Sequence, residues 1–132
     1  MKRYMLDTNT ISHLLKEHPA VSKRIVAVPM ASLCMSVITE GELLFGLAKR
    51  PLAKRLHLAV QEIQRRVDVL PWDRTTADCY GKIRAELERF GKILAPLDML
   101  IAAHALSIEA VLVTSDQAFS QMSDLQIEDW TV

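Results

Sequence analysis

Short apolar runs alternate along the chain with longer segments in which apolar residues recur at helical spacing. Three runs, at residues 3–6, 33–38 and 110–116, have the length and apolar content of strands. Residues 67–71 predict a further short strand or an extended link. Because the chain contains no Asn-Gly or Asp-Gly hairpin signal, we expect the strands to run parallel and to be connected by helices.

The amphipathic segments between these runs predict helices. Proline and glycine mark several of their ends, since Pro19 and Pro96 begin helices and Gly91 ends one. The final helix is apolar on almost all sides, as expected of a helix packed inside a domain. The predicted helices cover residues 11–18, 19–28, 39–50, 51–66, 73–90 and 96–106. This order of elements predicts an α/β fold in which helices cover a parallel sheet.

The length and composition are those of one globular domain. The chain has 132 residues, of which 50% are hydrophobic and 24% charged, so we interpret residues 1–132 as a single domain. Its longest apolar run, 93–106, contains polar residues and is shorter than the roughly 20 residues needed to span a bilayer. No apolar signal segment follows the first basic residues, and Cys34 and Cys79 are far apart. We therefore expect a soluble, cytoplasmic protein with reduced thiols and no membrane partner.

The net charge of zero conceals a strong asymmetry. Residues 1–92 contain all 16 basic residues and 10 acidic ones, whereas residues 93–132 contain six acidic residues and no basic one. Within residues 49–66, six basic residues accompany only Glu62, a density that attracts phosphate groups. The candidate phosphate-binding residues are Lys49, Arg50, Lys54 and Arg55. A solvated helix face explains the same pattern equally well.

Acidic residues stand at the ends of predicted strands and near the beginnings of predicted helices. Asp7 and Asp116 each follow an apolar run directly. Glu42 and Asp98 lie in the first turns of two predicted helices. Ligands of open parallel sheets bind at the carboxyl ends of the strands, where helices also begin. We therefore expect these four acids to share one edge of the sheet.

Each of these acids also has a purely structural explanation. Asp7 and Asp116 are placed to cap helices, and Thr39-x-x-Glu42 matches a capping box. Asp98 would gain only about 0.3–1 kcal/mol from the dipole of its helix, less than the cost of burying an unpaired carboxylate. It is the only acid in the long apolar run, and no basic residue follows that run. A divalent cation is the simplest partner for several carboxylates that meet at one edge.

The available ligands indicate the type of metal. Carboxylates with neighbouring hydroxyl and amide groups are hard oxygen donors, which favour Mg²⁺, with Mn²⁺ as a substitute, over Zn²⁺. The supporting polar residues are Thr8, Asn9, Thr114 and Ser115. The histidines lie at no metal-ligand spacing and are interpreted as surface or core residues; they are His13, His18, His57 and His104. A magnesium site beside a basic helix is typical of enzymes that cleave phosphodiesters.

Several segments of the chain resemble one family of ribonucleases. The chain is similar to the VapC ribonuclease toxins of bacterial VapBC toxin–antitoxin modules, which are PIN-domain proteins, in the segments MLDTN, SVITEGELLFG, IRAELERFGKILAPLDMLIAAHA, VLVTSDQAF and IEDW. The resemblance covers nearly the whole chain, in order and at the family's spacing. It implies a PIN-like three-layer α/β/α domain with a central parallel sheet, and magnesium-dependent endoribonuclease activity. The family's acidic motif positions fall on Asp7, Glu42, Asp98 and Asp116.

The same resemblance implies partners and a substrate. It implies a homodimer and a cognate VapB-type antitoxin, whose C-terminal segment wraps the toxin and blocks the site. Sequences of this kind are similar to enzymes that cut initiator tRNA in its anticodon region. The resemblance therefore predicts a toxin that cleaves tRNA and inhibits translation, and it makes Lys49, Arg50, Lys54 and Arg55 candidates for RNA binding.

Two other classes of α/β protein that carry an aspartate after the first strand require residues that this chain lacks. A phosphatase of the haloacid dehalogenase type needs an acid where Asn9 stands and a lysine late in the chain, yet no lysine follows Lys92. A phospho-receiver domain needs an early acidic pair and a late lysine, and neither is present. The remaining alternative is a non-catalytic interaction domain of α/β fold whose acids are only helix caps. Such a domain is indifferent to metal chelation, which distinguishes the two functions.

Overall fold

Residues 2–132 are described by a computed structural model, in which five strands form a single sheet. The strand order is β3-β2-β1-β4-β5, and every neighbouring pair is parallel. The strands are β1 (Tyr4–Leu6), β2 (Leu33–Ser36), β3 (Asp68–Leu70), β4 (Val111–Val113) and β5 (Ile127–Glu128). The predicted parallel sheet is confirmed, and the segment predicted as a short strand or link at 67–71 contains its edge strand β3.

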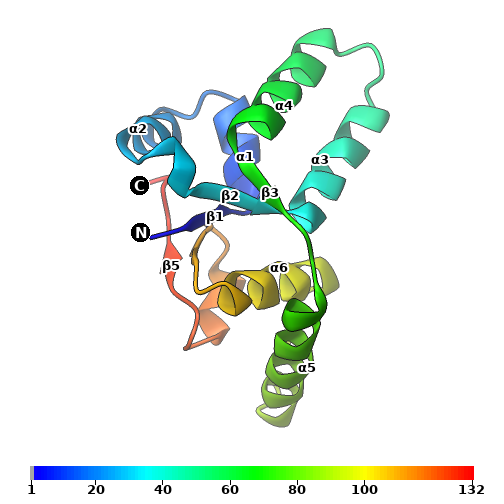
Figure 1. Cartoon of the computed structure of the whole chain (residues 1–132), viewed down its shortest axis with the longest axis vertical. Coiled ribbons are helices and arrows are strands. Elements are labelled where there is room, and N and C mark those ends of the chain that lie inside the picture. The colour runs from blue at the N-terminus through cyan, green and yellow to red at the C-terminus, as the bar shows by residue number, and fades with distance from the viewer. Residues whose placement is uncertain (1) are drawn as a thin grey trace.

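Within the described residues, six α-helices and two short 3-10 helices connect the strands. They are α1 (Thr8–Leu15), α2 (Pro19–Ala27), η1 (Met30–Ser32), α3 (Val37–Ala48), α4 (Lys54–Arg66), α5 (Arg74–Arg89), α6 (Pro96–Ser107) and η2 (Gln117–Gln121). In Figure 1, α1 to α4 lie on one side of the sheet, and α5, α6 and η2 lie on the other. This is the predicted three-layer α/β/α arrangement. Within residues 2–132, no helix is both long and apolar enough to cross a bilayer.

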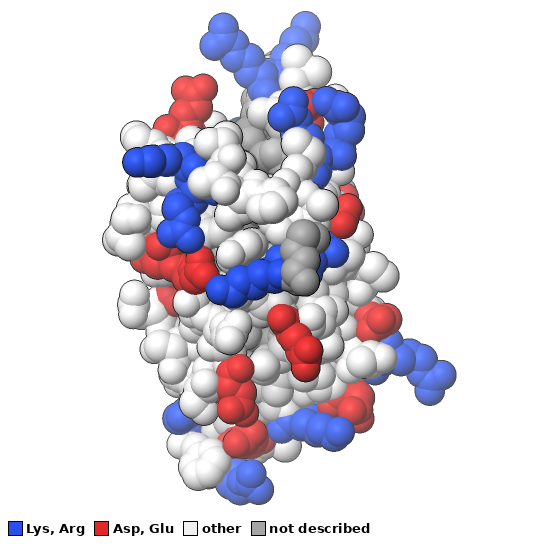
Figure 2. All heavy atoms as spheres, turned by 60° about the vertical axis from the view of Figure 1, so that its left-hand side comes forward, with Lys and Arg blue, Asp and Glu red and all other residues white. Residues whose placement is uncertain are grey.

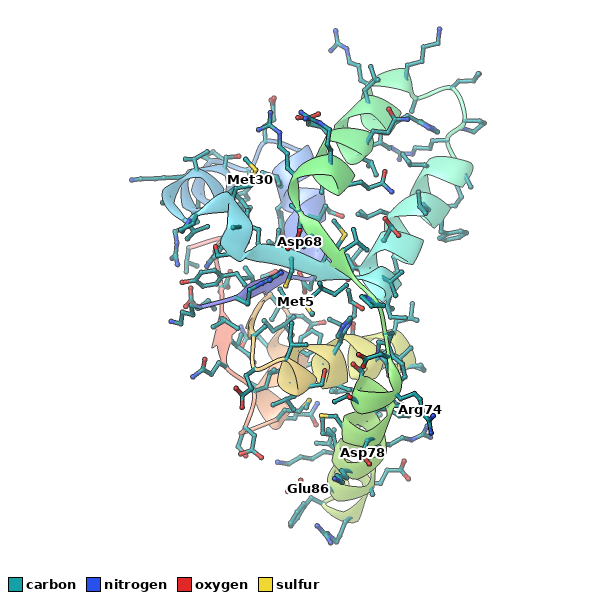
Figure 3. The ribbon with its side chains drawn as sticks, in the orientation of Figure 1. Met5, Met30, Asp68, Arg74, Asp78 and Glu86 are labelled. Atoms are coloured by element: carbon teal, nitrogen blue, oxygen red, sulfur yellow. The ribbon has the colours of Figure 1, made fainter. Side chains whose placement is uncertain are left out.

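The sheet separates two hydrophobic cores, because successive side chains of a strand point to opposite faces. Met5 of β1 packs with residues of α5, α6 and η2, and Figure 3 shows it near the centre of the molecule. Leu6, the next residue, packs with residues of α1, α3 and α4 on the other face. Both side chains are fully buried. Burial on both faces explains why the strands form unbroken apolar runs in the sequence.

Several boundaries differ from the sequence-based prediction. The strand predicted at 33–38 ends at Ser36, because the Ser36 hydroxyl accepts a hydrogen bond from the Ile38 amide at 3.1 Å and caps α3. Likewise, α1 begins at Thr8 rather than at residue 11, and α4 begins at Lys54 rather than at residue 51. The prediction has no counterpart of β5 or of the two 3-10 helices.

The register of the central strands brings their carboxyl ends level. Leu6 of β1 pairs with Val113 of β4, and the Asp7 amide donates a 3.1 Å hydrogen bond to the Val113 carbonyl. The Thr10 hydroxyl donates to the same carbonyl at 2.8 Å. As a result, the residues that follow β1 and those that follow β4 meet at one edge of the sheet.

Candidate active site at the acidic edge of the sheet

Asp7 is the most deeply buried acid at this edge, with 3% of its surface exposed. Its Oδ1 atom accepts a hydrogen bond from the Thr10 amide at 2.8 Å, so Asp7 caps α1 as its position in the sequence allows. Burial raises the pKa of the Asp7 carboxyl, while hydrogen bonds from Thr114 and Thr10 hold part of that rise back. The negative charge of Asp116 raises the same pKa further.

Asp116 follows β4 and caps the short helix η2. Its Oδ1 atom accepts a hydrogen bond from the Ala118 amide at 2.9 Å, and its own amide donates to the Thr114 hydroxyl at 3.0 Å. The capping explanation is therefore correct for both Asp7 and Asp116. It does not replace the site prediction, because the same two carboxylates lie close enough for one charge to affect the other.

Glu42 lies on the second turn of α3 and caps nothing. The Thr8 hydroxyl, 34 positions earlier, donates a 2.6 Å hydrogen bond to Glu42 Oε1. The capping-box explanation of Thr39 and Glu42 is wrong, because α3 starts at Val37 under the cap of Ser36. The structure thus joins Glu42 to the residue that directly follows Asp7.

Asp98 is the acid whose pKa responds to all three of the others. It is the third residue of α6, whose N-terminal cap residue Ala95 makes no side-chain cap bond. Burial raises the pKa of the half-buried Asp98 carboxyl, and the negative charges of Asp116, Glu42 and Asp7 raise it further. All three other acids therefore act on Asp98, as expected if they share one edge. We refer to Asp7, Glu42, Asp98 and Asp116 as the acidic cluster.

The chemistry of the acidic cluster suits a hard divalent cation. Its donors are carboxylate oxygens with neighbouring hydroxyls, and like charges held together are stabilised by a cation between them. The cluster therefore fits the metal in the chemistry of its donors. In the arrangement of residues 2–132, no group of three or more His, Cys, Asp or Glu side chains is placed to hold a metal ion.

The four supporting polar residues do not behave alike. Thr8 bonds to Glu42, and Thr114 bonds to Asp116. In the described part of the chain, no side-chain hydrogen bond joins Asn9 or Ser115 to the acidic cluster, and Asn9 is exposed. Thr10 was not among the predicted residues, although its place one turn after Asp7 is the usual signal for a capped amide.

The histidines take structural roles, as predicted. His104 is buried, with Nδ1 2.7 Å from the Ser36 hydroxyl. His18 accepts a 3.4 Å hydrogen bond from the Val21 amide at the start of α2, and its ring lies edge-on to that of His13. His57 Nε2 contacts the Arg50 carbonyl at 2.9 Å. None belongs to the acidic cluster.

The candidate RNA-binding residues divide into two pairs. Lys49 and Arg50 line a pocket of about 350 Å³ that also contains Thr8 and Glu42, so they share a cavity with one end of the acidic cluster. Lys54 and Arg55 begin α4 and do not line this pocket. Figure 2 shows Lys and Arg side chains projecting from the end of the molecule at which α3 and α4 are joined. Lys16 also lines the pocket and was missed by sequence reasoning, because a lone lysine after α1 carries no local signal.

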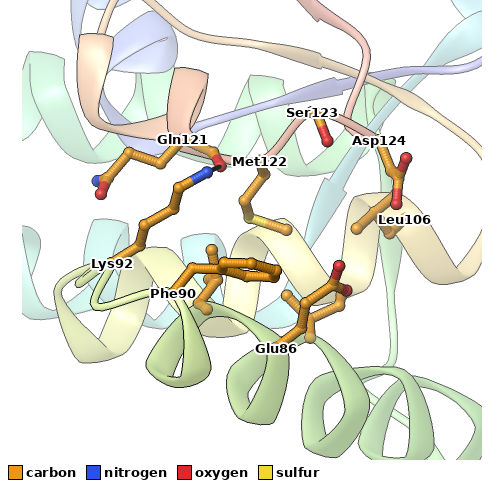
Figure 4. A pocket seen from close by; sticks show the side chains of 10 residues that line it. Glu86, Phe90, Lys92, Leu106, Gln121, Met122, Ser123 and Asp124 are labelled. Carbon is orange, nitrogen blue, oxygen red and sulfur yellow. Dashed lines mark hydrogen bonds between the residues drawn. The ribbon is translucent and has the colours of Figure 1, made fainter.

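A second pocket of about 310 Å³ lies elsewhere on the molecule. Figure 4 shows it between α5 and the segment that follows η2, where the Lys92 ammonium donates to the Gln121 carbonyl at 3.2 Å. Phe90 and Met122 supply its apolar wall, and Glu86 and Asp124 its acidic groups. It contains no residue of the acidic cluster.

Comparison with known proteins identifies the family to which this fold belongs. Residues 4–125 match the family model of the PIN domain. The chain is 39% identical to a tRNA(fMet)-specific endonuclease VapC of Salmonella typhimurium, with 98% of this chain and 99% of that protein covered. A protein of the same name from Shigella flexneri is 34% identical over 99% of this chain and its own full length.

Solved structures give the same result. The crystal structure of DNA-bound VapBC from Salmonella typhimurium superposes with a TM-score of 0.91 at 36% identity, with 98% of this chain and 99% of that chain covered. The sequence and the fold are each similar to those of known proteins over almost the entire length of the chain. The chain therefore belongs to the PIN-domain family and, within it, to the VapC group.

Proposed function

We propose that the chain is a divalent-metal-dependent endoribonuclease, the toxin of a toxin–antitoxin module, with residues 1–132 acting as one catalytic domain. The observation that carries the proposal is that Asp7 and Asp116 directly follow or closely follow two paired central strands, and that the 2.6 Å hydrogen bond from Thr8 brings Glu42 to the same edge of the sheet. The negative charges of these three acids raise the pKa of Asp98, in agreement with this arrangement. A domain whose acids served only as caps would have no reason to gather them. Asp98 and Glu42, which cap nothing, are the clearest departure from that alternative.

In this proposal Asp7, Glu42 and Asp98 would hold Mg²⁺, for which Mn²⁺ can substitute, and Asp116 would complete the site. Once bound, such a cation would polarise a phosphoryl oxygen and favour deprotonation of the attacking water. The chain's own residues orient the carboxylates: Thr8 holds Glu42 by its 2.6 Å hydrogen bond, and the Thr10 amide holds Asp7 at 2.8 Å. Lys49 and Arg50 attract the phosphate backbone toward this edge.

The substrate and partner follow from the relatives. Two of them carry the name tRNA(fMet)-specific endonuclease, which supports initiator tRNA as the substrate here. We place the cut in the anticodon region, where it would inhibit translation. The solved relative is a VapBC complex, which supports a cognate VapB-type antitoxin as partner. We further propose that the chain forms a homodimer and acts in the cytoplasm.

The test is cleavage of total cellular RNA by the purified, antitoxin-free chain, with mapping of new 5′ ends. We expect one sharp cut in one tRNA with Mg²⁺ and none with excess chelator or with Asp98→Asn. Full cleavage in chelator would contradict metal dependence. Absence of any cut with either metal would leave the non-catalytic interaction domain as the better explanation.

A further inference from the structure

The pocket between α1, α3 and α4 has one end inside the candidate active site. Thr8 and Glu42 line that end, and they are joined by their 2.6 Å hydrogen bond. A molecule seated in the pocket would therefore lie directly beside the acidic cluster. The volume of about 350 Å³ is within the range of pockets that bind small ligands.

The pocket combines an apolar floor with a basic rim. Leucine and valine side chains from three helices make the floor; they are Leu15, Leu43, Leu47, Leu56 and Val60. Lys16, Lys49 and Arg50 supply the cations of the rim. Two contacts help to hold this rim in place: the Lys49 ammonium lies 4.6 Å from the centre of the Phe45 ring, and His57 contacts the Arg50 carbonyl.

An apolar floor and a basic rim are complementary to a ligand that has a flat, weakly polar body and negative charge at its margin. A nucleotide has this form, because the faces of its base are apolar and its phosphates are anionic. An apolar peptide segment would also suit the floor. It would leave three cations at the rim without partners, so the charge of the pocket favours the nucleotide.

We propose that this pocket binds one nucleotide of the RNA next to the cleaved phosphodiester, with the base on the apolar floor and the flanking phosphates against Lys16 and Arg50. The inference rests on the proposed ribonuclease function and deepens it. It assigns one base, at a fixed position from the cut, a direct part in substrate recognition.

Gly46 offers a way to fill the pocket without replacing a residue of the acidic cluster or one of the cations. It lines the pocket from α3, and a Cβ atom added there meets no other atom within 4 Å. In Gly46→Leu the new side chain therefore enters open space, and the change favours the helix because leucine is a better helix former than glycine. Gly81→Leu is the matched control, since Gly81 is also helical and open but lies on α5.

The experiment measures cleavage of the RNA found with the wild-type chain, and of copies that lack one base near the cut. For wild type, we expect loss of one particular base to raise KM by about tenfold, while neighbouring abasic positions have less effect. Gly46→Leu should raise KM for intact RNA by a similar factor. Its KM should rise no further with the copy that lacks this base, because the leucine already keeps the base out of the pocket. Gly81→Leu should respond as wild type does.

Other outcomes overturn the inference. If Gly46→Leu keeps the wild-type KM and the full penalty for each missing base, the pocket holds no nucleotide. If it weakens only the binding of an antitoxin peptide, the pocket is a protein-docking site. A wild-type chain that cuts no RNA would remove the proposed function itself, whereas cleavage without this coupling removes only the inference.

A second variant keeps the test decisive if Gly46→Leu does not fold. Lys16→Gln removes one rim cation and requires no repacking, because Lys16 is exposed. It should raise KM and reduce the salt dependence of RNA binding by about 0.7 in the log–log slope. Lys23→Gln, which removes an exposed charge from α2, is its control and should leave the slope unchanged. An unchanged slope in Lys16→Gln would overturn the placement of phosphate at the rim.

Discussion

The Nδ1 atom of His104 lies 2.7 Å from the hydroxyl oxygen of Ser36, although the two residues are 68 positions apart. Ser36 caps α3, which carries Glu42, and His104 lies on α6, which carries Asp98. Burial lowers the pKa of His104 and so favours its neutral ring, and a hydroxyl can accept one hydrogen bond while it donates another. We infer that the Ser36 hydroxyl accepts from the Ile38 amide and donates to Nδ1 of His104. This single bond joins the two helices that bring acids to the site from opposite faces of the sheet.

The first prediction concerns the two ring nitrogens of His104. His104→Asn keeps an acceptor near the position of Nδ1, whereas His104→Gln places its amide near Nε2. We expect His104→Gln to lower the free energy of unfolding by about 2 kcal/mol and His104→Asn to lower it by less, because an unpaired buried hydroxyl is costly. Urea denaturation at pH 8 measures both. Equal losses would show that the Ser36 bond contributes little.

The lowered pKa of His104 predicts that the stability of the protein depends on pH. Burial lowers the pKa of His104 below its ordinary value of 6.5, and the nearby Asp73 offsets only part of this. As the pH falls, the unfolded chain therefore takes up a proton on His104 at a higher pH than the folded chain does. The contribution of His104 to the free energy of unfolding is complete above about pH 6.5 and is lost as the pH falls toward the lower pKa of the folded state. The stability difference between wild type and His104→Asn should narrow from pH 8 to pH 5. A constant difference over that range would contradict the prediction.

Neutralising Asp98 should stabilise the metal-free protein. Asp98 caps nothing and its pKa is raised, so its ionised form is disfavoured in the fold at neutral pH. We expect Asp98→Asn to raise the free energy of unfolding while cleavage is lost. Asp73→Asn is the comparison, because Asp73 caps α5 through Thr76 and its pKa is lowered. It should destabilise the protein, and a similar loss in both variants would mean that Asp98 is structural.

Magnesium should stabilise the wild-type protein specifically. At about ten times its dissociation constant, a ligand that binds only the folded state adds roughly 1.4 kcal/mol. Thermal melts with and without Mg²⁺ should show this gain for wild type and little of it for Asp7→Asn or Asp98→Asn. Mn²⁺ should act in the same way. Equal stabilisation of all three proteins would place the metal elsewhere or exclude specific binding.

The Thr8 hydroxyl should position Glu42 for catalysis. Thr8→Val has nearly the same shape but cannot donate the 2.6 Å hydrogen bond, whereas Thr8→Ser retains the hydroxyl. We expect Thr8→Val to cost about 0.5–1.5 kcal/mol of stability and to lower kcat by about tenfold, with Thr8→Ser close to wild type. Steady-state cleavage rates with both variants measure this effect. Equal activity in Thr8→Val would mean that Glu42 needs no such support.

The sequence alone determined the parallel sheet and the order of the six α-helices and of strands β1, β2 and β4. These features follow from local periodicity, because a strand buried on both faces is apolar throughout and an amphipathic helix is not. It also placed Asp7 and Asp116 together. Both follow central strands, and the carboxyl ends of paired parallel strands lie side by side. The capping bonds of these two acids are likewise local and were foreseen.

Only the tertiary structure decided which polar groups meet across long separations. Ser36 rather than Thr39 begins α3, because its hydroxyl also contacts His104 on a helix from the opposite layer. The bond between Thr8 and Glu42, and the place of Lys16 in the pocket, depend on how α1, α3 and α4 pack. Strand β5 has two residues, too few to show a periodic pattern, and exists through its pairing with β4. Such contacts leave no local signal, because their energy arises only when distant segments pack together.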